Sequence, residues 1–577
     1  MPALVLNQTE QRLDRTSLQE RLQRETAEIQ SAYKAKVITF MVDDGIETIS
    51  DIDYPARVRF EQWLKDKTTP ASFRQYMNAF DNIKRYSLSQ EMRIIQHGKV
   101  VRPKYENTIL FLPYHPNADI REMFKKAPDK NRLAWDFTRK TSERLKRQIF
   151  DILHYIFECD SSYENRRRHL LGLREVYDFC TDEGIEDIEQ LELPQIQKFM
   201  ALESEQLQPE KRTGILTYCR KALFMQADEI NWNAHVWFLD RFHIQPERLD
   251  AASPVSTISF VEVEHRKNRD LLKKYTRYGL GLTNISVSAI RAEHTFIRNF
   301  LCAVSQDDDT DICSVTPAQM EEYFGRQRQR DIQAETYNKI VMSIFHFFNY
   351  LRVKQYIETI PFDAESCLKK TLPKHLDRSV AQAVTEEIFE KLPGFPETIR
   401  LMYLHLWGIG LRISEVCSLK GDAYYIQGED AWIQVYQIKM RTYKRIPIPE
   451  ALYKLMKVYL KKHGIQAEDY VFQNSKGGAY RTGTFRYNML KYCEINHIQN
   501  GEYVFKSHDY RHTIATYFYN TGVPLQSIRD YLGHDYEEMT EQYIDYMPKK
   551  IEKASEEYFS RHSLAACMKR GEKKTNY

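Results

Sequence analysis

Apolar residues follow a pattern that appears three times in the first half of the chain. In each copy a helical run ends on an aromatic residue, an acidic turn follows, and an isoleucine-containing connector leads to a proline. The copies read FMVDDGIETISDIDYP, FCTDEGIEDIEQLELP and FLCAVSQDDDTDICSVTP, and they end at Pro55, Pro194 and Pro317. Proline suits the first turn of a helix because its missing N–H needs no partner there. The pattern therefore predicts that a new helix begins at each proline.

A further helical run follows each copy, and the copies are about 120 to 140 residues apart. This uneven spacing is typical of a repeated domain and not of a solenoid. We therefore predict a helical extension at residues 1–35 and three helical domains at 36–139, 140–255 and 256–372. Prolines at 254 and 373 indicate linkers, and the second linker is the expected hinge before the last domain.

The last third of the chain alternates between helical runs and one pair of strands. The stretch AWIQVYQIKMRTYKRIPIP contains two runs of alternating apolar and polar residues joined by a basic turn, which is typical of a β-hairpin. We predict one domain at residues 373–550, mostly helical with a small antiparallel sheet, and a helical tail at 551–577. The expected fold class is a mainly α, multi-domain protein.

Composition excludes several classes of protein. No apolar run reaches the length of a membrane span or a signal peptide, so we expect a soluble cytoplasmic protein without a membrane partner. Nine cysteines form no C-x-x-C pair, which argues against a disulfide framework or a zinc ribbon. The net charge of +3, from 83 basic and 80 acidic residues, does not by itself indicate nucleic acid.

The candidate chemistry lies between residues 507 and 546, where His508 and Arg511 precede a Leu-Gly-His turn ending at His534 and a tyrosine at 543. A second arginine, Arg412, stands upstream in GLRISE. Guanidinium groups match the oxygens of a phosphodiester with paired hydrogen bonds, and imidazoles add donors or a proton shuttle. A tyrosine hydroxyl can attack phosphorus, because the phenolate leaves again readily. The stretch is typical of a phosphate-handling site.

The order of these motifs resembles that of the tyrosine recombinase, or phage integrase, family. The resemblance covers roughly residues 374–550 and rests on GLRISE, HDYRHTIAT, LGH and the final tyrosine. It implies an enzyme that cuts one DNA strand with the tyrosine, holds a 3′-phosphotyrosine and joins a new partner strand. It implies no metal and no cofactor.

The resemblance also assigns roles to residues. Arg412 and Arg511 would clamp the scissile phosphate, Tyr543 would attack it, and His508 and His534 would donate hydrogen bonds or manage protons. Tyr543 also has a plainer interpretation, as a packing residue. It falls on a stripe of apolar residues with helical spacing.

Lys439 on the hairpin would protonate the leaving 5′-oxygen. Its neighbours are Ile438 and Met440 where the family often has a glycine, so Lys444 or Arg441 could hold that role instead. Glu415 would be a buried support for the helix that carries the first arginine.

The expected partners are double-stranded DNA and further copies of the chain in a synaptic tetramer, or a partner recombinase. We expect residues 36–139 to be a DNA-binding arm and residues 140–255 to be similar to a core-binding domain. The resemblance implies that residues 256–372 are the core-binding domain and that the tail at 551–577 docks on a neighbouring subunit or in cis. Length and the additional helical domains favour a transposon-encoded member that integrates, excises or transposes a mobile element. The basic candidates for phosphate contacts in the helical domains are Arg74, Arg85, Arg166, Arg167, Arg168, Arg212, Arg220, Lys339 and Arg352.

Three alternatives stay open from the sequence alone. One is a catalytically silent DNA-binding regulator with the same fold, and another is a type IB topoisomerase-like activity. The third is a zinc hydrolase that uses His508, His512 and His534, although HDYRH lacks the glutamate of the H-E-x-x-H motif. The target sequence, the direction of the reaction and any accessory protein are not encoded in a readable pattern.

Overall fold

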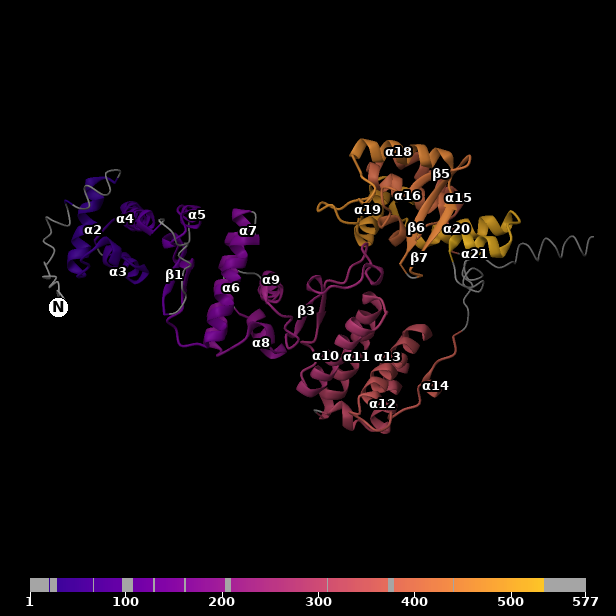
Figure 1. Ribbon diagram of the computed structural model, residues 1–577, viewed down its shortest axis with the longest axis horizontal. Coiled ribbons are helices and arrows are strands. Elements are labelled where there is room, and N and C mark those ends of the chain that lie inside the picture. Colours follow the sequence, from indigo (N-terminus) through magenta and orange to yellow (C-terminus); the bar gives the residue numbers. More distant parts are fainter. Residues whose placement is uncertain are drawn as a thin grey trace, which may run out of the picture. The chain divides into compact units, whose positions relative to one another are not determined.

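The computed structural model describes residues 20, 29–65, 67–95, 107–127, 130–159, 162–202, 209–308, 310–371, 378–438 and 440–533 (Figure 1). The chain divides into two compact units. The first comprises residues 1–241 and 259–264, and the second comprises 242–258 and 265–577. Most of the predicted extension at 1–35 and the whole tail at 551–577 lie outside the described residues.

The first unit is built mainly from helices. These are α2 (Ser31–Asp43), α3 (Tyr54–Lys65), α4 (Pro70–Ile95), α5 (Ala118–Met123), α6 (Glu143–Cys159), α7 (Tyr163–Asp182), α8 (Leu193–Met200) and α9 (Pro209–Gln226). The short strands β1 (Ile109–Phe111) and β2 (Ala134–Asp136) form an antiparallel pair before α6. A three-residue strand, β3 (Val236–Phe238), follows α9, whereas β4 (Thr257–Ser259) spans the boundary at residue 258.

The second unit contains a helical part and a part with a sheet. The helical part has α10 (Arg266–Leu282), α11 (Val287–Asp308), α12 (Pro317–Gln329), α13 (Ala334–Val353) and α14 (Ala364–Cys367). The other part has α15 (Gln382–Lys391), α16 (Glu397–Ile409), α17 (Ile413–Cys417), α18 (Glu450–His463), α19 (Thr482–Ile495), α20 (Ser507–Asn520) and α21 (Leu525–Leu532). Its strands are β5 (Tyr424–Gln427), β6 (Asp430–Gln437) and β7 (Thr442–Pro447). The prediction of a mainly α protein with a small antiparallel sheet is confirmed.

The repeated connectors have one structure in all three copies. Each connector is a short 3-10 helix, at Ile49–Asp51, Ile188–Gln190 and Ile312–Ser314, and its isoleucine is at most 3% exposed. Asp187 and Asp311, directly before the second and third connectors, accept backbone N–H groups and so cap these short helices. Helices α3, α8 and α12 then begin with the predicted prolines in their first turns. The predicted helix starts are therefore confirmed.

The apolar cores divide the first unit differently from the sequence pattern. One core gathers residues between Val37 and Ile83, and a second gathers residues between Leu112 and Leu223. The segment from Leu112 to Phe137, which we expected within 36–139, contributes to this second core, and Trp135 in it is fully buried. The other domain boundaries stay a prediction.

Three of the arginines proposed from the sequence as phosphate contacts are buried inside the first unit. Arg85, Arg212 and Arg220 are at most 7% exposed. Their guanidinium groups donate to backbone carbonyls, such as those of Pro113, Met200 and Ile188. These arginines tie loops to helices inside the first unit, so the structure does not support their assignment as DNA contacts.

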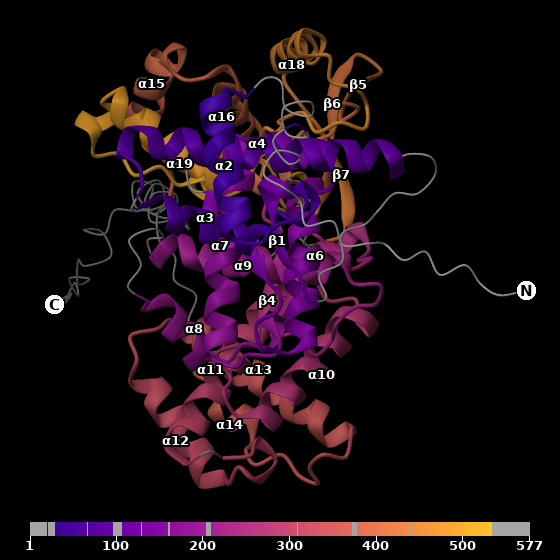
Figure 2. The same cartoon turned by 90° about the vertical axis from the view of Figure 1, so that its left-hand side faces the viewer.

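The sheet of the second unit has the order β5-β6-β7 with antiparallel pairing, so the predicted hairpin is confirmed. Along β6 the residues at alternate positions from Ala431 to Gln437 are buried. Helix α18 lies beside β5 and β6 in both views (Figures 1 and 2). Helices α16 and α20 pack against each other, and this pairing brings together the two sequence motifs that contain arginine. No described helix has the length and apolar character needed to cross a bilayer.

Candidate active site

The end of α16 fixes the position of Arg412. Gly410 caps the helix in the left-handed conformation with φ of 64°, and a Cβ there would lie 2.5 Å from Ile514 Cγ2 on α20. Glycine therefore permits both the turn and the close packing of the two helices. Arg412 follows two residues later as the N-terminal cap of α17.

Glu415 is a buried carboxylate at the centre of the site. It accepts hydrogen bonds from the backbone N–H of Arg412 at 3.0 Å and from its Nη1 at 2.9 Å, and it pairs with Lys444 Nζ at 3.1 Å. Burial alone would raise its pKa, but Lys444, Arg511 and Arg412 together outweigh burial and lower the pKa to about 2. Glu415 is therefore ionised at neutral pH and serves as the counter-ion of the cations around it.

Lys444 is the lysine that the described structure brings to this carboxylate. Its side chain is 6% exposed, and Nζ also donates to the carbonyl of Leu532 at 3.3 Å. Burial lowers the pKa of Lys444 to about 8, with Arg511 and Arg412 adding to the effect and Glu415 opposing it. A lysine with this pKa can release a proton near neutral pH.

The other two candidate cations of the hairpin are Lys439 and Arg441. Lys439 lies outside the described residues. Arg441 adopts a positive φ of 53° in the hairpin turn and donates to the carbonyl of Asn284. The alternation along β7 puts Lys444 on the same buried face as Ile446, which is the sequence signal that distinguishes it from Arg441.

Arg511 is held by backbone groups of two other segments. It is 1% exposed, and its Nη1 donates to the carbonyl of Gly410 at 3.0 Å while Nη2 donates to that of Leu532 at 2.5 Å. These bonds connect α20 to the end of α16 and to the end of α21. The orientation of the guanidinium is therefore set by the tertiary structure.

His508 lies one turn before Arg511 on α20. Its burial, together with the nearby His512, Arg511 and Arg412, lowers the pKa of the imidazole to about 4. The ring is therefore neutral at pH 7, and one of its nitrogens can donate a hydrogen bond. The ring of His512 lies 5.1 Å from that of His508 between centroids.

The turn after α21 approaches the hairpin through a residue that sequence reasoning missed. Gln437 on β6 is 3% exposed and donates from Nε2 to the carbonyl of Gly533 at 3.0 Å and to Glu415 at 3.4 Å. Gly533 has φ of 68°, and a Cβ there would lie 2.3 Å from Gln437 Nε2. Gln437 thus holds the residue directly before His534.

The structure gathers Arg412, Lys444 and Arg511 around one carboxylate, Glu415, with His508 beside them. Three cations against one anion leave a positive excess that suits an anionic phosphate. His534 and Tyr543 lie outside the described residues, so their positions stay a prediction. Within the described ranges no cluster of three or more His, Cys, Asp or Glu could hold a metal, and the third ligand of the zinc alternative, His534, is outside them.

Comparisons with known proteins place this site in a family. Residues 378–550 match the model of the phage integrase family. Transposase B from transposon Tn554 of Staphylococcus aureus strain Mu50 is 26% identical over 326 residues, which cover 55% of this chain and 51% of that protein. The chain thus matches about half the length of this relative. The tyrosine recombinase XerA of Thermococcus onnurineus is 24% identical over 289 residues, which cover 50% of this chain and 94% of that protein.

Solved structures similar to this chain include a XerH site-specific recombinase bound to palindromic difH substrate, with a TM-score of 0.40 and 17% identity over 50% of this chain and 83% of that one. The Tn1549 transposon integrase in complex with circular intermediate DNA has a TM-score of 0.37 and 18% identity over 49% of this chain and 98% of that one. The family model spans all four described site residues, namely Arg412, Lys444, His508 and Arg511. Residues 378–550, which contain these four residues, therefore match the phage integrase family.

Proposed function

We propose that this protein is a site-specific DNA recombinase that cuts and rejoins DNA strands through a 3′-phosphotyrosine. The observation that carries the proposal is the placing of Arg412, Lys444 and Arg511 around the buried carboxylate of Glu415. A phosphodiester under attack gathers negative charge on its non-bridging oxygens, and preorganised cations stabilise that charge without reorganising.

In the proposed step the Tyr543 oxygen attacks the scissile phosphorus. A bond forms between phosphorus and the tyrosine oxygen, whose proton passes to one of the two histidines that manage protons, His508 or His534. The bond to the 5′-oxygen breaks, and the 5′-oxygen takes up a proton. Arg412 and Arg511 hold the non-bridging oxygens, and neutral His508 donates a hydrogen bond to one of them. The 5′-hydroxyl of a partner strand then reverses the step, so that the energy of the bond is kept.

The proton for the 5′-oxygen comes from a lysine of the hairpin. Lys439 is the position implied by the resemblance to the family, and Lys444 is supported by its contact with Glu415 and by its pKa of about 8. His534 would complete the set as a second imidazole, and Gly533, the residue directly before it, accepts a hydrogen bond from Gln437 Nε2 at 3.0 Å.

The proposed substrate is double-stranded DNA with a core site, bound by several copies of the chain in a synaptic tetramer or together with a partner recombinase. The similarity to a Tn554 transposase supports a role in moving a transposon. We further propose that residues 256–372 bind DNA opposite the catalytic domain, and that the tail at 551–577 docks on a neighbouring copy.

A nicked suicide DNA tests the proposal, because loss of a short 5′ fragment traps the covalent protein–DNA complex. The wild-type chain is expected to form this complex and Tyr543→Phe to form none, while both bind the DNA equally. Tyr546→Phe is the matched control, three residues away, and should react like wild type. No complex with wild-type protein would favour a silent DNA-binding regulator, and loss of activity in a chelator would favour the zinc alternative.

A further inference from the structure

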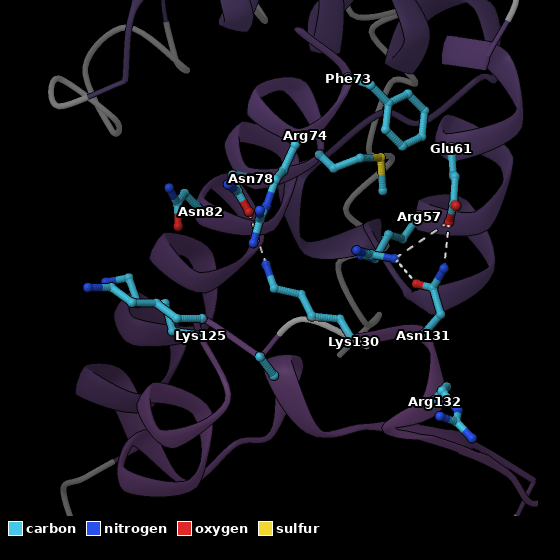
Figure 3. Close-up of a pocket in the computed structure, with 13 residues that line it drawn as sticks. Arg57, Glu61, Phe73, Arg74, Asn78, Asn82, Lys125, Lys130, Asn131 and Arg132 are labelled. Carbon is cyan, nitrogen blue, oxygen red and sulfur yellow. Dashed lines mark hydrogen bonds and ion pairs between the residues drawn. The ribbon is translucent and has the colours of Figure 1, made fainter. Parts of the chain in front are cut away.

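The first unit contains a cavity of about 790 Å³, between α4 and the residues at 125–127 and 130–132 (Figure 3). On α4 the side chains of Arg74, Asn78 and Asn82 recur at intervals of four residues and line one wall. A face of eight residues along a helix is about 12 Å long. The cavity is therefore longer than a single phosphate group.

The lining is strongly cationic. Six of its side chains are basic, and Glu61 is the carboxylate among the lining residues. The basic residues are Arg57, Arg74, Lys125, Lys126, Lys130 and Arg132. Arg74 and Lys126 are exposed and Arg132 is half-buried. Their charged groups can therefore be reached by a ligand from solution.

A buried aspartate orients two of the cations. Asp81 lies behind the cavity at 1% exposure, and it accepts from Arg57 Nε at 2.7 Å and from Lys130 Nζ at 2.8 Å. Lys130 also donates to Asn78 Oδ1 at 3.1 Å, as Figure 3 shows. These bonds hold two long side chains in place before a ligand arrives, which lowers the entropy lost on binding.

The amides make the lining suitable for a phosphate backbone. Arginine, lysine and asparagine side chains are among the groups that contact DNA phosphates, whereas pockets for small molecules are mostly apolar. Among the described residues, the six cations face three carboxylates, those of Glu61, Asp81 and Glu122, and this positive excess suits a polyanion with regularly spaced charges.

We propose that this cavity binds the phosphodiester backbone of duplex DNA outside the core site. The inference rests on the proposed function, since it assigns a second contact region on the same DNA. It makes Arg74, Lys126 and Arg132 phosphate contacts, with Lys130 as a preset donor, whereas the buried Arg57 supports Asp81 and Asn131. Because phosphate contacts position a protein without specifying sequence, the cavity would fix where the flanking DNA runs.

The test compares two triple variants of the full chain. The first is Arg74→Gln, Lys126→Gln and Arg132→Gln. The matched control is Lys65→Gln, Lys140→Gln and Lys211→Gln, which removes the same charge from three exposed lysines of the same unit that do not line the cavity. Binding to a duplex with a core site and long flanks is measured across a range of salt concentrations, together with the footprint.

Each lost phosphate contact reduces the slope of log affinity against log salt by about 0.9, so the cavity variant should lose between about 2 and 3 units of slope. Its footprint should shorten on the flanking side, and the control should keep both. On a short duplex that contains only the core site, the two variants should bind alike. Equal slopes and footprints for the two variants on the long duplex would overturn the inference.

Two further measurements separate this inference from the proposed recombinase function and from binding of other phosphate ligands. Covalent complex formation on the short suicide DNA tests the proposed function alone, and the cavity variant should retain it. Suppose that wild type forms no such complex, while the slope of log affinity against log salt is still smaller for the cavity variant than for wild type. In that case the proposed function fails and the cavity still binds DNA. Inorganic phosphate and duplex RNA are the competing ligands, and a cavity variant that loses binding to either one but keeps its DNA slope would overturn the assignment to DNA.

Discussion

Lys444 and Glu415 form a buried ion pair with 3.1 Å between Nζ and Oε2, and both side chains are at most 6% exposed. The same carboxylate also accepts from Arg412. One anion thus positions two cations, and its removal would leave the buried Lys444 and the partly buried Arg412 without their counter-ion.

Replacing Glu415 with Gln should destabilise the catalytic domain by about 3–5 kcal/mol at pH 7, because a buried charge loses its partner. The pKa of Glu415 falls from its usual 4.5 to about 2 on folding, so its contribution is complete above pH 4.5 and is lost as the pH falls through 2. The difference in unfolding free energy between wild type and Glu415→Gln should therefore narrow between pH 4.5 and 2. A difference that stays constant across this range in urea titrations would contradict the pairing.

Lys444→Met should slow cleavage if Lys444 protonates the 5′-oxygen. A substrate with sulfur in place of the bridging 5′-oxygen leaves as a thiolate and needs no proton, so it should restore the rate of the variant. The rate of the wild type on the oxygen substrate should fall as the pH rises through about 8, where the ammonium loses its proton. Lys439→Met is the matched comparison, and rescue by sulfur in that variant alone would assign the role to Lys439.

Arg511→Lys should lower the cleavage rate by on the order of hundreds-fold, since the loss of a donor to the transition state typically costs about 3–4 kcal/mol. A lysine also cannot reproduce the paired bonds to the carbonyls of Gly410 and Leu532. Single-turnover cleavage with saturating enzyme separates this effect from binding. A near-normal rate would remove Arg511 from the site.

Gly533→Ala should displace the Gln437 amide, which lies 2.3 Å from where the new Cβ would be, and should shift the following His534. The left-handed backbone adds about 1–2 kcal/mol of strain. If the contact with Gln437 matters, the loss of cleavage rate caused by Gly533→Ala should be smaller in a Gln437→Ala background. Strictly additive losses in this double-mutant cycle would show that the amide does not position the turn.

A fragment that begins at Phe242 should fold and form the covalent complex, whereas one that begins at Phe260 should be less stable. Ala252 is 1% exposed within the core of the catalytic domain, and its carbonyl accepts from the backbone N–H of Thr482 at 3.1 Å. The shorter fragment lacks this contact. Thermal unfolding of the two fragments measures the difference, and equal midpoints would mean that the segment only links domains.

The sequence by itself determined the features that depend on neighbours along the chain. The three connectors, the helix starts at Pro55, Pro194 and Pro317 and the hairpin all follow from local spacing and backbone preference. The order of the motifs around Arg412 and Arg511 was also enough to indicate the family, because its residue types and spacings are specific.

Only the tertiary structure decided which distant groups meet. It put Lys444 against Glu415, and it set Gln437 against Gly533, nearly a hundred residues further along the chain. It also showed that Arg85, though basic, binds carbonyls inside the first unit. Charge and periodicity along the chain indicate whether a residue can be buried. The partner of a buried polar group, however, depends on how helices and strands pack. That packing is set by contacts between residues far apart in sequence.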